Sequence, residues 1–309
     1  MTIIVTGASG DLGRRVTEQL LRIVPPAELI LTTRKPQALS GLAARGVRVR
    51  YADFDEPQTL LDAFAGGADK LFLISTLSVG RRARQHRNAI EAAVKCGVRH
   101  IVYTSSGGAR ADNPAIVIPD HLDTEAALKA SGVAFTILRD ALYAEVPLID
   151  IGMRALASGQ WVGSAGEGQV PFVAKSDCVA CAVKVLTSDG HEGQTYEITG
   201  PELLSYRQAA ALQAEFGGRP IEYVVISDEE MIEMLVAAGV PREYREGLYT
   251  PGVGTSSAED IVSYERGIRG GYFALKSDHV ERLLGRPPRT LRQVYEDHRA
   301  LFRVAPTPK

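Results

Sequence analysis

Three glycines near the beginning of the chain, Gly7, Gly10 and Gly13, have a spacing that suits phosphate binding. Where a strand turns into a helix, the first glycine permits the tight turn, the second lets the backbone approach a pyrophosphate, and the third lets the helix pack closely on the sheet. The phosphates would lie at the helix N-terminus, where unpaired N–H groups and the helix dipole favour negative charge. The pattern is Gly-x-x-Gly-x-x-Gly, and it predicts a dinucleotide site formed by Gly7, Ser9, Gly10, Asp11, Leu12 and Gly13.

The residues after the next apolar run indicate which ribose this site would hold. A ribose without a 2′-phosphate usually meets Asp or Glu here, but the chain has Thr33, Arg34 and Lys35, with no carboxylate. A guanidinium can bind a phosphate through two parallel hydrogen bonds. Arg34 therefore predicts NADPH in preference to NADH, with NADH as the alternative cofactor. The other interpretation of Arg34 is a solvated side chain at a strand end.

Further polar residues follow other predicted strands. Asp53 comes directly after one of them, where a carboxylate can accept from the adenine amino group; otherwise it would cap the next helix, a role that Asp55 fills better. Ligands bind at the carboxyl ends of the strands in a doubly wound sheet. We therefore expect cofactor contacts from Ser75, Thr76 and Thr104. Ser105 would face the active crevice as a candidate catalytic residue.

His121 is the sharpest candidate for acid–base chemistry. It lies four residues before Glu125, so both share one helix face and the carboxylate could hold the imidazole. An imidazole with a near-neutral pKa could protonate an acceptor oxygen as hydride arrives. The other interpretation is a histidine that packs beside the cofactor, and positioning alone would then suffice for substrates whose products are stable. Tyr143 is a further catalytic candidate, and Tyr143, Trp161 and Tyr249 are candidate aromatic walls for a flat substrate.

The elements that must position these residues alternate between strand and helix. Apolar runs predict strands at residues 2–6, 29–33, 47–51, 71–75, 100–104 and 134–138. Amphipathic runs predict helices at residues 14–24, 81–96, 121–132 and 176–186. This alternation predicts an α/β protein with a Rossmann-type doubly wound parallel sheet. We expect residues 1–155 to form this domain, completed by residues 170–190.

Residues 156–309 are expected to form most of a smaller C-terminal α/β substrate lobe, interleaved with the first domain. Glycine-rich residues 161–172 predict a loop and short strands, and residues 193–199 predict a strand. Helices at 205–216 and 227–238 would be joined through a strand at 221–226, and residues 249–254 predict a loop.

Composition excludes several classes of protein. The formal net charge of −2 gives no bulk field for nucleic acid or an anionic membrane. A strand at residues 2–6 would leave no room for a signal peptide, and no apolar run approaches the ~20 residues of a membrane span. Three cysteines cannot build a disulfide scaffold, which suits the cytoplasm. Cys178 and Cys181 share one apolar helix face and are expected in the core rather than on a metal. The basic run at residues 81–87 is either a solvated face or a surface for an acidic partner.

The chain resembles the NmrA-like family of atypical short-chain dehydrogenase/reductases, in the branch of the NAD(P)H:quinone reductases and triphenylmethane dye reductases. The resemblance covers nearly the whole chain. The segments that carry it are residues 5–13 (VTGASGDLG), Asp53, 97–105 (GVRHIVYTS), 121–132, 135–143 (FTILRDALY), 196–200 (YEITG) and 278–288 (DHVERLLGRPP).

The resemblance also shows a departure from the family. Short-chain dehydrogenases usually carry Tyr-x-x-x-Lys on the helix after the fifth strand, but no such pair occurs there, and Tyr272 with Lys276 matches it only by coincidence. In the related benzylic ether reductases a lysine lies on this helix eleven residues before the Gly-x-x-Phe/Tyr-Thr turn. Counting back from Gly132 places His121 at that position.

The resemblance implies an NADPH-dependent oxidoreductase that passes hydride directly to a quinone-like or conjugated aromatic acceptor, without metal or flavin. We expect a monomer or homodimer that acts on a small aromatic molecule. The alternative is a regulatory protein that senses NADP(H) without turnover and acts through protein partners, which the missing Tyr-x-x-x-Lys favours. An isomerase or lyase with the same fold is a third interpretation, because fold does not fix chemistry.

Overall fold

The computed structural model describes residues 1–245 and 256–303 of the chain. These residues divide into two compact units. Unit 1 comprises residues 1–106, 119–139 and 178–196, and unit 2 comprises residues 107–118, 140–177 and 197–309. The expected loop at 249–254, with the candidate Tyr249, lies outside the described residues.

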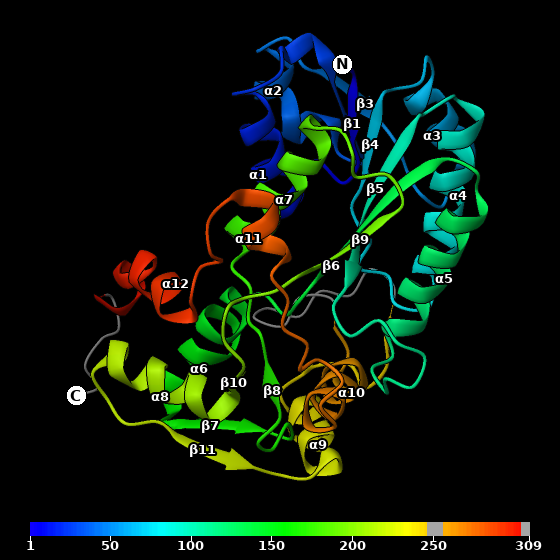
Figure 1. Cartoon of the computed structure of the whole chain (residues 1–309). Helices are drawn as coiled ribbons and strands as arrows, with labels where there is room; N and C mark the ends of the chain where they lie inside the picture. The colour runs from blue at the N-terminus through cyan, green and yellow to red at the C-terminus, as the bar shows by residue number, and fades with distance from the viewer. Residues whose placement is uncertain (246–255, 304–309) are drawn as a thin grey trace. The chain divides into compact units, whose positions relative to one another are not determined.

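Unit 1 is built on a seven-stranded sheet with the strand order β3-β2-β1-β4-β5-β6-β9 (Figure 1). Its strands are β1 (Ile3–Val5), β2 (Leu29–Thr33), β3 (Arg48–Tyr51), β4 (Lys70–Leu73), β5 (His100–Ser106), β6 (Ala134–Asp140) and β9 (Gln194–Ile198). The pairs β1·β2, β1·β4, β2·β3 and β4·β5 are parallel. The predicted Rossmann-type sheet is therefore confirmed. The strand order reverses between β1 and β4, and in such folds ligands bind in the crevice at that point.

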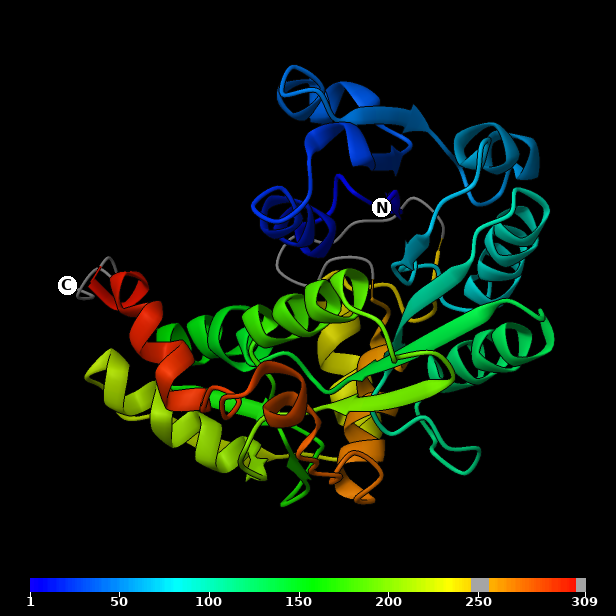
Figure 2. The same ribbon diagram turned by 45° about the horizontal axis from the view of Figure 1, so that its top comes forward.

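Helices cover both faces of this sheet. They are α1 (Asp11–Leu20), α2 (Ser40–Ala43), α3 (Pro57–Phe64), α4 (Arg82–Lys95), α5 (Ile118–Ala130) and α7 (Lys175–Thr187), with the short turns η1 (Pro26–Glu28) and η2 (Pro36–Leu39). Figures 1 and 2 show α3, α4 and α5 side by side on one face, while α1 and α7 lie on the other. Every residue of β1, β2 and β4 is buried, as expected for strands covered on both faces.

The core of unit 1 explains why these helices dock where they do. Leu60 and Phe64 of α3, Ile90 of α4 and Leu128 of α5 pack against the sheet in one buried cluster. Cys178 and Cys181 of α7 are 2% and 0% exposed, which confirms the prediction that they lie in the core.

Unit 2 contains two small sheets and several helices. Parallel β7 (Gln160–Gly163) and β11 (Glu222–Val225) form one sheet, and antiparallel β8 (Gln169–Val170) and β10 (Leu204–Ser205) form the other. Its helices are η3 (Val146–Ile151), α6 (Gly152–Ser158), α8 (Tyr206–Gly217), α9 (Asp228–Ala237), α10 (Ala258–Arg269), α11 (His279–Leu284), α12 (Leu291–Asp297) and η4 (Arg299–Arg303). Capping boxes at Ser205 and Ser227 explain where α8 and α9 begin.

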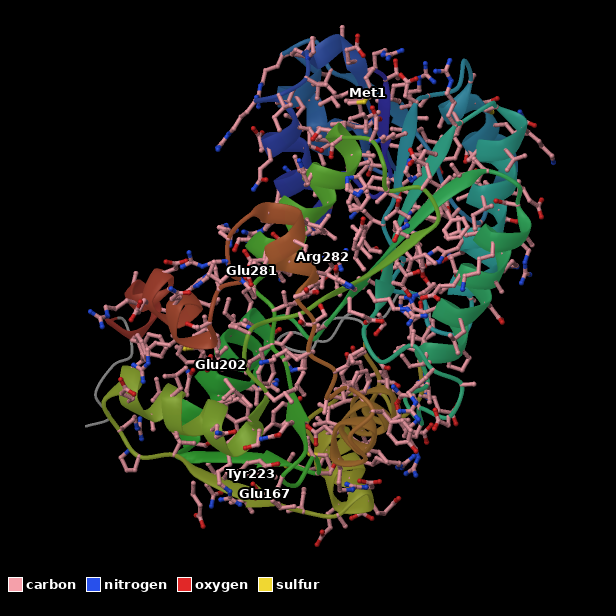
Figure 3. The ribbon with its side chains drawn as sticks, viewed as in Figure 1. Met1, Glu167, Glu202, Tyr223, Glu281 and Arg282 are labelled. Carbon is pink, nitrogen blue, oxygen red and sulfur yellow. The ribbon has the colours of Figure 1, made fainter. Side chains whose placement is uncertain are left out.

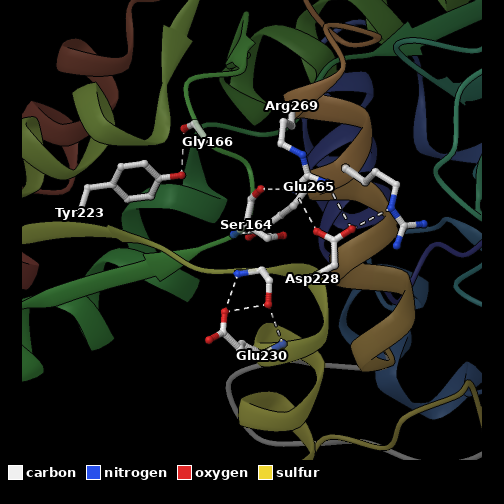
Figure 4. A network of polar contacts seen from close by, with 9 residues as sticks. Ser164, Gly166, Tyr223, Asp228, Glu230, Glu265 and Arg269 are labelled. Carbon is white, nitrogen blue, oxygen red and sulfur yellow. Dashed lines mark hydrogen bonds and ion pairs between the residues drawn. The ribbon is translucent and has the colours of Figure 1, made fainter.

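Charged side chains hold unit 2 together. Glu265 of α10 is buried and accepts hydrogen bonds from the N–H and O–H groups of Ser164, just after β7 (Figure 4). Burial raises the pKa of this carboxyl group, although the bonds from Ser164 oppose the rise. The guanidinium of Arg207 donates to Glu167 over 2.7 Å, and its Cζ lies 5.1 Å from the ring centroid of Tyr223. Glu167 and Tyr223 are labelled in Figure 3.

Trp161 is only 1% exposed and packs against Tyr206, with 5.6 Å between the ring centroids. Trp161 is therefore a core residue of unit 2 rather than a wall for a flat substrate.

Candidate functional site

The glycine-rich turn of unit 1 has the geometry that the sequence predicts. Gly7 has φ of +57°, which favours glycine, and the N–H of Gly10 donates to the carbonyl of Gly7 over 2.9 Å. A Cβ at Gly13 would lie 2.6 Å from the Gly7 carbonyl oxygen and 2.7 Å from Cα of Ala8, so only glycine fits there. No side chain caps α1 at Gly10. The beginning of this helix is therefore shaped and polarised for a dinucleotide phosphate.

Side-chain contacts tie this turn to the end of β2 and to η2. Oγ of Ser9 lies 2.7 Å from Oγ1 of Thr33. The guanidinium of Arg14 donates to the carbonyl oxygens of Ser9, over 2.9 Å, and Ala38, over 3.0 Å. Arg14 was missed at the sequence level, although a cation directly after the third glycine is a visible signal. The turn and the end of β2 thus form one surface.

Arg34 lies at the end of β2 with an exposed side chain that forms no ion pair within residues 1–245 and 256–303. β2 and the turn that follows it carry no carboxylate. A 2′-phosphate would therefore meet an available guanidinium and no like charge, so the residues present fit NADPH.

Asp55 does not have the capping role that the sequence predicts for it. Oδ1 of Asp53 accepts from the N–H of Asp55 over 3.0 Å, and α3 begins at Pro57 without any side-chain cap. The prediction that Asp55 caps this helix is wrong. Its carboxylate instead binds three side chains of the α4 region, namely Arg81 at 2.6 Å, Arg84 at 2.7 Å and Gln85 at 2.8 Å. Two residues of the basic run, Arg81 and Arg84, are thus paired with a carboxylate of unit 1 instead of being exposed to solvent alone.

Hydroxyl groups link the carboxyl ends of the three central strands. The N–H of Ile74 donates to Oγ1 of Thr6 over 3.0 Å. The N–H of Ser75 donates to Oγ1 of Thr104 over 2.8 Å. Ser75 and Thr104, both expected beside the cofactor, therefore lie together at one edge of the sheet.

Thr76 is held by residues of α4 at each of its polar groups. Its N–H donates to Nε2 of His86 over 3.0 Å, and its O–H donates to Gln85 over 2.7 Å. Its carbonyl accepts from Nε of Arg82 over 2.6 Å. Thr76 is thus a fixed point of the segment between β4 and α4, and its cofactor contact stays a prediction.

His121 is buried with two hydrogen-bond partners. Nη1 of Arg82 lies 3.3 Å from its Nε2, and the hydroxyl of Tyr103 lies 2.8 Å from its Nδ1. A guanidinium only donates, so Nε2 accepts, and the proton of the neutral imidazole lies on Nδ1, towards Tyr103. Burial, followed by the charge of Arg82 and by His86, lowers the pKa of His121 well below its usual value. The expected near-neutral pKa of His121 is therefore wrong.

The helical spacing predicted that Glu125 holds His121, and this prediction is wrong. The carboxylate of Glu125 binds Arg139 of β6 through two bonds of 2.9 and 2.7 Å, and it also accepts from Oγ of Ser105 over 2.7 Å. Glu125 is 2% exposed, and a guanidinium compensates a buried carboxylate better than a neutral imidazole can. Ser105 is likewise buried and serves this ion pair, so its catalytic role stays a prediction.

Tyr143 belongs to unit 2. Its hydroxyl donates to Oδ2 of Asp140 over 3.1 Å, and Nζ of Lys175 lies 5.6 Å from its ring centroid. Its catalytic role also stays a prediction. In the part of the chain that the structure describes, no three His, Cys, Asp or Glu side chains gather as metal ligands, and no helix has the length and apolar character to cross a bilayer.

Comparisons with known proteins agree with this geometry. A family model described as NAD(P)H-binding matches residues 7–170. Quinone oxidoreductase 2 of Escherichia coli (strain K12) is 35% identical over 290 residues, which cover 94% of this chain and 96% of that protein. The NAD(P)H azoreductase of Xenophilus azovorans is 30% identical over 303 residues, which cover 98% of this chain and all of that protein.

A solved structure extends the similarity to three dimensions. The structure of the Citrobacter sp. triphenylmethane reductase complexed with NADP(H) matches with a TM-score of 0.83 and 32% identity. The match covers 96% of this chain and 99% of that chain.

Proposed function

Because the chain belongs to the NAD(P)H-binding, NmrA-like family of atypical short-chain dehydrogenase/reductases, we propose that it reduces a quinone-like or conjugated aromatic acceptor by direct hydride transfer from NADPH. The protein is an NAD(P)H-dependent reductase. Three relatives named for quinone, azo and triphenylmethane reduction support the proposed class of acceptor. The sensor alternative has no such support among them.

The observation that carries the proposal is the turn at Gly13, where the backbone of Gly7 and Ala8 leaves no room for a side chain. This turn would hold the pyrophosphate of the cofactor, and Arg34 would hold its 2′-phosphate. Asp53 would accept from the adenine, and Ser75 and Thr104 would lie beside the nicotinamide. The bound cofactor supplies a hydride, so the protein's task is to orient two flat molecules and exclude water.

The test is consumption of NADPH, measured by its absorbance, with a simple quinone, an azo dye and a cationic triphenylmethane dye. We expect turnover of at least one acceptor without added flavin or metal. Gly13→Ala should abolish NADPH binding in a fluorescence titration. The matched control is Gly41→Ala, because a Cβ there meets no atom within 4 Å. Tight NADPH binding without turnover of any acceptor would overturn the proposal and favour the sensor.

A further inference from the structure

Arg82 is a buried cation without a carboxylate partner in residues 1–245 and 256–303. Its residue surface is only 6% exposed. Nε donates to the carbonyl of Thr76 over 2.6 Å, and Nη1 donates to the imidazole of His121 over 3.3 Å. Both partners are neutral groups. The carboxylate of Asp55 is already shared by Arg81 and Arg84.

A guanidinium removed from water normally needs a compensating anion. The charge of Arg82 contributes to lowering the pKa of both His121 and His86, after burial as the larger cause. It also opposes the rise that burial imposes on the pKa of Tyr103. The positive field of Arg82 therefore acts on the surrounding side chains. At Tyr103 the charges of Glu125 and Asp120 oppose this field, but neither carboxylate forms an ion pair with Arg82 in the part of the chain that the structure describes.

Arg82 is tied to the edge of the sheet at which ligands would bind. Thr76, which it holds, follows β4 at the carboxyl edge of the sheet in unit 1, and ligands of doubly wound sheets bind at that edge. An uncompensated charge with fixed orientation stabilises charge that develops during a reaction, because no reorganisation is needed.

We propose that the guanidinium of Arg82, positioned by Thr76 and His121, stabilises the negative charge that a neutral acceptor gains on accepting a hydride. This inference rests on the proposed function and assigns Arg82 a selective effect on the acceptor. The charge of Arg82 acts on the acceptor, and its bond to the Thr76 carbonyl positions the segment between β4 and α4.

The charge balance of the reaction makes the inference testable. A neutral quinone that accepts a hydride, which carries two electrons, becomes a hydroquinone monoanion; a proton from water then completes the hydroquinone. A cationic triphenylmethane dye that accepts the same hydride becomes a neutral molecule. The cofactor loses the hydride and its two electrons in both reactions. Arg82 should therefore favour the first acceptor and not the second.

The experiment measures kcat of Arg82→Gln with a neutral quinone and with a cationic triphenylmethane dye. We expect kcat for the quinone to fall about tenfold or more, and kcat for the dye to stay unchanged or rise. The dissociation constant for NADPH, measured by fluorescence, should stay within about twofold, because Arg82 is not placed on the glycine turn. Arg82→Lys keeps the charge and should retain most of the quinone activity even if Arg82→Gln folds poorly.

Arg84→Gln is the matched control. It removes a mostly exposed arginine side chain from the same helix. It should change neither kcat. Equal loss with both acceptors in Arg82→Gln would overturn the inference and leave Arg82 a structural role, while the proposed function would stand. An unmodified protein that reduces neither acceptor would overturn both.

Discussion

The guanidinium of Arg82 and the imidazole of His121 are joined from Nη1 to Nε2 over 3.3 Å. This bond assigns the imidazole proton to Nδ1, where it faces Tyr103 rather than a substrate. Protonation of His121 would place a second positive charge beside Arg82 in a buried position, which is why the pKa of the imidazole lies low.

The pH profile of turnover tests this assignment. We expect the kcat of the unmodified protein to show no inflection near pH ~6.5, the ordinary pKa of histidine. His121→Asn should keep turnover within about tenfold of the unmodified protein, because a general acid typically contributes 10²-fold or more. An inflection near that pH that disappears in His121→Asn would restore His121 as the proton donor.

Acid should destabilise the fold through His86. Burial, with a smaller contribution from Arg82, lowers the pKa of His86 to about 3. Between that value and the unfolded pKa of ~6.5, the unfolded chain binds more protons than the folded chain. The free energy of unfolding therefore decreases by about 1.4 kcal/mol for each unit by which the pH is lowered. Urea titrations of His86→Gln should show a dependence shallower by about that amount between pH ~6 and ~4.

The same titrations near neutral pH are the control for His86, since both states are then mostly unprotonated at this residue. Parallel pH dependences for the variant and the unmodified protein in acid would contradict a neutral, buried His86.

Cofactor selectivity should depend on Arg34. A hydrogen bond to a charged group contributes about 1.5–3 kcal/mol, so Arg34→Ala should weaken NADPH about 10- to 100-fold and change NADH within about twofold. Calorimetric titration of both cofactors measures the ratio. Arg22→Ala is the control, because Arg22 is an exposed arginine just past α1. Equal weakening of both cofactors by Arg34→Ala would refute the 2′-phosphate assignment.

The ion pair of Glu125 and Arg139 should be important for stability. Arg139→Ala removes the guanidinium bound to a nearly inaccessible carboxylate and leaves only Lys129, whose mostly exposed ammonium lies 4.0 Å away. Breaking a buried pair typically costs about 3–5 kcal/mol in the free energy of unfolding. Arg45→Ala breaks an exposed pair with Glu18, whose side chains are each about half exposed, and should cost less than about 1 kcal/mol. Urea titration compares the two variants. Similar losses would show that Arg139 does not compensate Glu125.

The fold was predictable from sequence because buried parallel strands, helices and glycine turns leave local patterns. Most strands and helices of unit 1 occur close to the apolar and amphipathic runs that predict them, and Gly7 and Gly13 have the predicted constraints. The first helix differs, because α1 spans Asp11–Leu20 rather than residues 14–24, and α2 was not predicted. The pairing of polar side chains was less predictable. The spacing of His121 and Glu125 identifies a shared helix face, but the partner of Glu125 comes from β6, which is distant in sequence.

The burial of Arg82 was also not predictable from the local sequence. Its sequence neighbours are basic and suggest a solvated face, yet Arg82 is buried while Arg81 and Arg84 bind Asp55. Nothing in the local pattern separates these arginines, because their different environments arise from the packing of α4 against α5 and the end of β3.

The interleaving of the two units has a consequence for synthesis of the protein on the ribosome. Unit 1 collects its residues from three segments, and the last of them, residues 178–196, supplies part of α7 and most of edge strand β9. Domains generally fold as units while the chain emerges. The dinucleotide-binding unit therefore cannot be completed until almost two thirds of the chain has been translated. A fragment that stops at residue 155 would expose one edge of the sheet at β6, a site prone to aggregation.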